Sequence, residues 1–197
     1  MHILHYTLGF PPYRSGGLVK YALDLMLEEQ ELGCDVCALY PGTVSLLKNK
    51  CEVIEPKEYK GIKTFEIVNP MPVPLLYGIK SPKDFFQEKG IDIGSFITLL
   101  DEFKPDVLHV HTLMGLPKLF LMQAKERNVK LVYTSHDYFG ICPLVNLINR
   151  NGMVCSNVSN SKECAKCNAK VHDTWFLRLR NMKWVISLGR KIKQIKR

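Results

Sequence analysis

The chain has 197 residues, 46% of them hydrophobic, and a formal net charge of +8. It is long enough for one substantial core, and the lack of any apolar run of about 18 residues excludes a spanning helix within it. Eight basic residues and no acidic one follow Asp173, whereas the rest of the chain holds 19 of each. The basicity therefore belongs to the C-terminal segment, which argues against nucleic acid as a partner of the whole surface.

The first residues lack the basic stretch and long apolar core of a secretory signal, so we expect a cytoplasmic protein. The seven cysteines are odd in number, which, without such a signal, argues against a disulfide framework.

Strands and helices are predicted to alternate as far as residue 134. We expect strands at 2–8, 35–40, 106–111 and 129–134, two short strands within 51–68, and helices at 17–32, 92–103 and 114–127. Residues 69–82 are rich in proline and predict an extended loop, and Pro117 should lie in the first turn of its helix. This order predicts an α/β fold with a Rossmann-like, doubly wound parallel sheet, in which ligands bind at the carboxyl ends of the strands.

Gly16 and Gly17 stand between the first strand and its helix. A helix N-terminus presents free N–H groups, and glycine allows a phosphate to approach closely. The spacing is neither that of a dinucleotide fingerprint nor that of a Walker loop, which argues against NAD. A phosphate site and a flexible connecting turn remain equal alternatives from this loop alone. Arg14 could assist a phosphate or an acceptor, although no spacing supports that role.

The histidines near strand ends are the other candidates at this edge. His109 and His111 are two apart on a strand and share one face, and we expect His109 to be satisfied within the sheet and His111 to reach the cleft. His136, with Asp137 beside it, is the stronger candidate for orienting a hydroxyl or sharing a proton. His2 and His5 are expected to be packing residues.

Four cysteines cluster late in the chain, in a stretch where periodicity fails. Their spacing is Cys142-x12-Cys155-x8-Cys164-x2-Cys167, and a pair two residues apart can supply two ligands to one zinc ion. We expect a structural zinc here and no catalytic metal, because four thiolates leave no open position. The alternative is a set of reduced thiols in an irregular loop.

The C-terminal segment predicts a basic amphipathic helix. Over 174–197 the apolar residues Trp175, Leu179, Met182 and Ile186 share one face. Such a helix can lie on an anionic membrane surface, for which residues 183–197 are the best candidates. The alternative is an ordinary packed helix whose lysines face water.

Three landmarks in this chain resemble the N-terminal half of family 4 (group 1) glycosyltransferases. They are PPYRSGG at 11–17 with a helix ending ELGCDV at 31–36, KPDVLHVH at 104–111, and TSHDYFGICP at 134–143 followed by NRNG at 149–152 and Cys155. The resemblance covers about residues 1–170. It implies a GT-B fold and transfer of a sugar from a nucleotide-sugar donor with retention of configuration. It also implies that Gly16 and Gly17 lie near the donor diphosphate. His136 is implied to contact the transferred sugar or to support the reacting centre.

The family's second domain, which makes most donor contacts, has no counterpart in these residues. We therefore expect an acceptor-side domain at 1–172, with a cysteine-bearing insertion at 136–172 and a basic helix at 173–197, that needs a missing C-terminal half or a companion subunit. Its acceptor would be a saccharide or a lipid-linked saccharide of cell-surface polysaccharide or glycolipid biosynthesis, and the chain alone would turn over poorly. The alternative is a non-catalytic, zinc-stabilised module that docks on a membrane or a partner protein.

Overall fold

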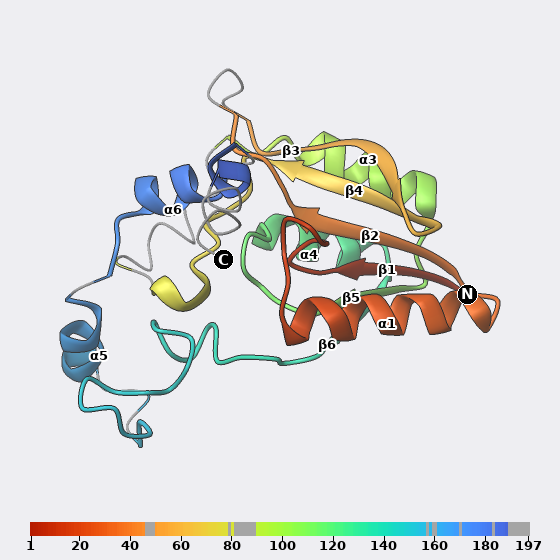
Figure 1. Ribbon diagram of the computed structural model, residues 1–197. Helices are drawn as coiled ribbons and strands as arrows, with labels where there is room; N and C mark the ends of the chain where they lie inside the picture. Colours follow the sequence, from red (N-terminus) through yellow and green to blue (C-terminus); the bar gives the residue numbers. More distant parts are fainter. Residues whose placement is uncertain are drawn as a thin grey trace.

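The protein is built around one six-stranded sheet (Figure 1). The computed structural model describes residues 1–45, 50–78, 80, 90–156, 158, 161–169, 171–182 and 184–188. The strands are β1 (His2–Tyr6), β2 (Asp35–Pro41), β3 (Glu52–Tyr59), β4 (Ile62–Val68), β5 (Val107–Val110) and β6 (Lys130–Tyr133). Their order is β3-β4-β2-β1-β5-β6, and every neighbouring pair is parallel except the β3–β4 hairpin.

Helices cover both faces of this sheet (Figure 1). Helix α1 (Gly17–Glu31) covers one face, and α3 (Ile93–Phe103) and α4 (Lys118–Glu126) cover the other. The remaining helical elements are the 3-10 turn η1 (Leu75–Tyr77), α5 (Ser161–Asn168) and α6 (Thr174–Arg180). The apolar stripe of α1 packs with Val36 and Ala38 on one face. Phe96 of α3 and Phe120 of α4 pack with Leu4 on the other. Because successive residues of a strand point to opposite faces, both sides of the central strands are buried.

This arrangement confirms the predicted Rossmann-like, doubly wound sheet. The strand order changes direction at β1, whose neighbours are β2 on one side and β5 on the other. Open parallel sheets bind ligands outside the strand ends at such a point. The helix expected at 114–127 begins only at Lys118, and Pro117 precedes it in an extended conformation instead of lying in its first turn. A turn at Gly115, where φ is +81°, separates that helix from β5.

The C-terminal helix differs from the expected one. Helix α6 ends at Arg180, where the chain turns, and its buried residue is Leu177 rather than the exposed Trp175 and Leu179. Asn181 is buried as well and binds the carbonyl oxygens of Val73 and Leu177 through its amide, at 3.3 and 2.7 Å. Of the apolar face expected from periodicity, Met182 is buried and Ile186 half-buried, whereas α6 itself docks through Leu177.

The membrane contact expected of residues 183–197 falls largely outside the described residues, which include only 184–188 of that stretch. Among the helices that the structure describes, none has the length and apolar character needed to cross a membrane.

Leu100 and Leu32 offer a matched test of the core. Leu100 is 2% exposed within the cluster between the sheet and α3, whereas Leu32 is 81% exposed at the end of α1. We expect Leu100→Ala to lower the free energy of unfolding by about 2–5 kcal/mol, because it removes packed methyl groups and leaves a cavity. Leu32→Ala should change it by less than about 0.5 kcal/mol. Urea denaturation measures both, and equal effects would contradict the burial of α3.

Candidate functional site

The carboxyl ends of β1, β5 and β6 lie at one edge of the sheet, because the three strands are parallel neighbours. The loop after β1 leads to Gly16 and Gly17 at the start of α1. His111 directly follows β5, and His136 follows β6 after two residues. The structure therefore brings the glycines and these two histidines, which are far apart in sequence, to the same edge.

The N-terminus of α1 is open to an anion. Gly16 precedes the helix with φ of +122°, a conformation that favours glycine, and no side chain caps the first turn. A Cβ built on Gly16 or on Gly17 would meet no atom within 4 Å. The first turn contains no acidic residue. There is therefore room beside the two glycines, and the free N–H groups and positive dipole end of a helix start favour an anion.

Beneath α1, three histidines share the face of the sheet that this helix covers. His5 of β1 pairs in register with His109 of β5, and His111 is two residues further along. The Nδ1 atom of His5 lies 3.0 Å from Nε2 of His111, and both side chains are buried. His5 is buried in the core, as expected, and both of its ring nitrogens have polar partners there.

Glu29 of α1 contacts this group of histidines from the helix side. Its carboxylate lies 2.6 Å from Nε2 of His5. At the other end, Nδ1 of His111 lies 3.4 Å from Nε2 of His136. A chain of polar contacts therefore runs from Glu29 through His5 and His111 to His136, which we call the histidine chain. His109 stands beside it and bonds to the Thr134 hydroxyl at 2.8 Å.

The carboxylate of Glu29 sets the direction of the histidine chain. An ionised carboxylate only accepts, so Nε2 of His5 carries a proton, and in the neutral tautomer of His5 the Nδ1 atom is then the acceptor. His111 then donates from Nε2 to His5 and accepts at Nδ1 from Nε2–H of His136. This assignment follows from the hydrogen-bond network. Nδ1 of His136 is left as the acceptor at the open end.

Burial disfavours the charged form of His109, His111 and His136 by lowering the pKa of each. Burial lowers the pKa of His111 to about 3, and the neighbouring His109, His5 and His136 add to that shift. Burial also lowers the pKa of His109 from its usual value, helped by His5 and opposed by Glu29. For His136, burial lowers the pKa while Asp137 opposes the shift. A neutral imidazole can exchange a hydrogen bond with a hydroxyl group, whereas a charged one only donates.

His136 is the member of the histidine chain that reaches the surface. It is half-buried, and the ring of Tyr21, one turn into α1, lies edge-on against it at 4.9 Å between centroids. This contact places His136 one helical turn from the glycine N-terminus. Asp137 shapes the loop, since its carboxylate accepts from the backbone N–H of Phe139 at 2.9 Å.

Two of the predicted site residues, His111 and Arg14, do not lie at the open surface beside His136. His111 is 1% exposed and sits behind His136, so it does not reach an open cleft as expected. The Arg14 guanidinium donates to Oδ1 of Asn181 at 2.6 Å and lines a separate cavity of about 320 Å³. None of the other predicted site residues lines that cavity. Arg14 thus links the first loop to the segment after α6.

A family model for Glycosyltransferase Family 4 matches residues 15–153, which include the glycines, the histidines of β5 and His136. The chain belongs to glycosyltransferase family 4.

Comparison with other proteins adds one structure to this family match. A search of curated proteins finds no match. Among solved structures, this family 4 domain resembles the catalytic domain of starch synthase IV from Arabidopsis thaliana bound to ADP and acarbose. The two chains share 17% identity with a TM-score of 0.42 over 70% of this chain. The aligned part is 34% of the other chain, so this domain spans about a third of its length.

Sequence reasoning missed Glu29 in this family 4 domain. One signal was present: Glu29 follows Met26 by three residues and so continues the buried stripe of Val19, Ala22 and Met26. A carboxylate on the core side of an amphipathic helix requires a polar partner. The sequence alone could not show that this partner is His5, because the packing of α1 against β1 decides the contact.

The buried His111 predicts a loss of stability in acid. The unfolded chain binds a proton on this histidine below about pH 6.5, whereas the folded chain does so only near its lowered pKa of about 3. As the pH falls between these values, the free energy of unfolding should drop by about 1.4 kcal/mol per pH unit from this residue alone. Urea denaturation at about pH 7.5 and about pH 5 measures the slope.

His111→Gln is the control for this slope, because it removes the titrating imidazole. Its pH slope can be compared with that of the unsubstituted protein even if its free energy of unfolding differs. The variant should lose less free energy over the same pH interval. An identical slope in both proteins would show that His111 is not held neutral by the fold.

Proposed function

We propose that this domain is the acceptor-side half of a retaining glycosyltransferase that takes a sugar from a nucleotide-sugar donor. The observation that carries the proposal is the open glycine N-terminus of α1 with neutral His136 one helical turn away. The first supplies backbone donors for a diphosphate and the second a group for a sugar hydroxyl. Their proximity suits a substrate in which a sugar is joined to a diphosphate.

In this mechanism the protein positions the reactants and stabilises developing charge. The amides of the first turn of α1, beginning at Gly17, would hold the leaving diphosphate as negative charge grows on it. His136 would accept a hydrogen bond at Nδ1 from a hydroxyl of the transferred sugar. The histidine chain fixes its ring, since rotation would break the bond to the buried His111. Fixed orientation of a sugar against a leaving group supplies much of the catalysis in such reactions.

We propose that the remaining wall of the donor site comes from a second domain or a companion subunit. The space in front of Gly16 and Gly17 is open, and within the described residues nothing faces it within 4 Å of a built Cβ. A nucleotide needs contacts to its base and ribose that these two glycines do not provide. The acceptor would be a saccharide or a lipid-linked saccharide of a cell-surface polysaccharide or glycolipid. The basic C-terminal segment would then hold the enzyme at the inner face of a membrane.

Gly17→Ala tests the diphosphate site without disturbing the fold. The added methyl group meets no protein atom, and alanine is favourable at a helix start, so stability should not fall. The methyl group would occupy the space that we assign to the diphosphate. We expect the affinity for ADP, GDP or UDP, whichever binds best, to weaken by about tenfold or more, measured by calorimetry. Unchanged affinity at unchanged stability would place the diphosphate elsewhere.

His136→Ala tests the sugar contact in the complete enzyme. We expect kcat/KM for transfer from the nucleotide-sugar to fall by about 100-fold or more, because the variant loses a group that acts on the reacting sugar. Release of nucleoside diphosphate measures the rate. The matched control is His2→Ala at the opposite edge of the sheet, where His2 bonds to the Phe103 carbonyl, and it should retain the rate.

Two outcomes would count against this reading. Full turnover by His136→Ala would remove His136 from the mechanism. Turnover at a normal enzymatic rate by the 197-residue chain alone would contradict the need for a second half.

A further inference from the structure

The insertion between β6 and α6 lacks a hydrophobic core of its own. Between residues 138 and 169, Val145 is the single buried residue among those that the structure describes. Helix α5 presents none of its described side chains to a core. Segments of this size without a core need disulfides or a metal to hold one structure. All four cysteines of the insertion are free thiols, so disulfides do not provide that support.

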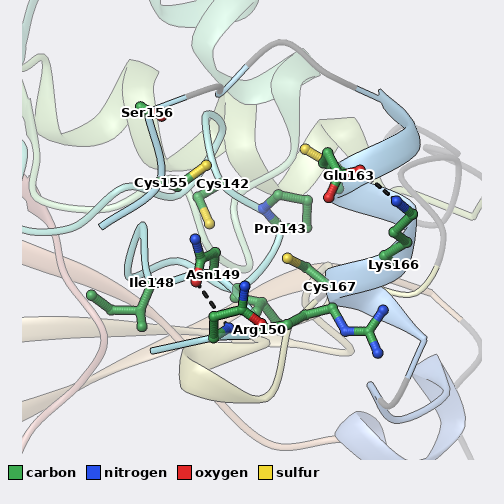
Figure 2. Close-up of a pocket in the computed structure, with 13 residues that line it drawn as sticks. Cys142, Pro143, Ile148, Asn149, Arg150, Cys155, Ser156, Glu163, Lys166 and Cys167 are labelled. Atoms are coloured by element: carbon green, nitrogen blue, oxygen red, sulfur yellow. Dashed lines mark hydrogen bonds and ion pairs between the residues drawn. The ribbon is translucent and has the colours of Figure 1, made fainter. Parts of the chain in front are cut away.

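The four cysteines of the insertion surround one cavity. It has a volume of about 330 Å³, and Cys142, Cys155, Cys164 and Cys167 all line it. Figure 2 shows Cys142 and Cys155 on the coil at one side and Cys167 on α5 across from them. Cysteines that are 25 residues apart in the chain thus converge, although little apolar packing brings them together.

The backbone around the cysteines is well suited to present ligands. Cys164 and Cys167 are three residues apart on α5, which places them on one side of the helix. The Cys155 N–H donates to the Leu147 carbonyl at 2.7 Å, within a hairpin-like turn. The Cys142 N–H donates to the Tyr138 carbonyl at 2.9 Å. Three separately supported pieces of chain therefore present cysteines to the same cavity.

We propose that Cys142, Cys155, Cys164 and Cys167 bind one structural zinc ion as four thiolates, and that this ion holds the insertion together. Zinc prefers four thiolates in a tetrahedron, with Zn–S distances of about 2.3 Å. Binding releases the thiol protons to solvent and converts four neutral thiols and Zn²⁺ into a site of charge −2. Arg150 lines the same cavity and brings positive charge to it, whereas Lys166 there is ion-paired with Glu163.

Binding requires the cavity to contract. Among the described residues, the one group of three ligand atoms within 4.8 Å of one another is that of His5, His109 and His111, so no three of these sulfurs are that close. In a tetrahedral site the sulfurs lie about 3.8 Å apart. The histidine group is the competing metal site, but Nδ1 of His5 and Nε2 of His111 already bond to each other at 3.0 Å.

The test is the metal content of the full chain. We expect about one zinc per chain after purification with a thiol reductant and dialysis against metal-free buffer. Cobalt(II) added to the apoprotein should give the intense visible bands and near-ultraviolet charge-transfer band of a tetrahedral thiolate site, and zinc should displace it. Zinc should also slow proteolysis within 136–172.

Substitutions test which side chains bind the zinc ion. The double variant Cys164→Ser/Cys167→Ser should lose both the zinc and the cobalt spectrum, whereas Cys34→Ser, outside the cavity, and His111→Gln should retain them. Less than about a tenth of a zinc per chain in the unsubstituted protein would overturn the proposal, whether or not the double variant folds. Iron with a visible iron–sulfur absorption would overturn zinc as the occupant. Zinc lost in His111→Gln but kept in the double variant would assign it to the histidines.

Discussion

The parallel pairing of β1 with β2 on one side and with β5 on the other is the constraint on which the candidate site depends. Parallel strands send their carboxyl ends to one edge, so the loops that follow β1, β2, β4, β5 and β6 all leave from there, whereas β3 runs the other way. The strand order changes direction at β1. The loop after β1, which carries Gly16 and Gly17, and the loop after β5 therefore leave from adjacent strands at this edge. The start of α1, where we propose that the diphosphate binds, and His136 therefore lie at the same edge, although about 120 residues separate them in the chain.

A second constraint comes from the polar groups that α1 buries. Histidines between a helix and a sheet lose their water, and they are tolerated because each finds a partner in its neighbours. The Glu29 carboxylate completes this arrangement, since it gives His5 an acceptor and so fixes which nitrogen of every imidazole carries the proton. The result is a surface histidine whose ring orientation and proton position are set from within the core. Removal of any internal member would leave a buried polar atom unpaired.

The two parts of the molecule are stabilised by different means. The sheet and its helices bury apolar side chains on both faces, and their stability follows from that burial. The insertion after β6 has almost no such burial, and its polar turns, such as the one in which the Asn149 side chain accepts from Asn151 and Met153, organise only a few residues each. A metal on its four cysteines would supply the long-range link that packing does not.

The sequence by itself determined the elements, the parallel α/β class and the family landmarks, because hydrophobic period, glycine and proline act locally. It also identified Gly16, Gly17 and His136 as candidates through their places next to strand ends. Only the tertiary structure decided which side chains meet. His5 meets His111 across 106 positions, and Arg14 meets Asn181 across 167. Such contacts depend on strand register and helix placement, to which distant residues contribute jointly, so no local pattern records them.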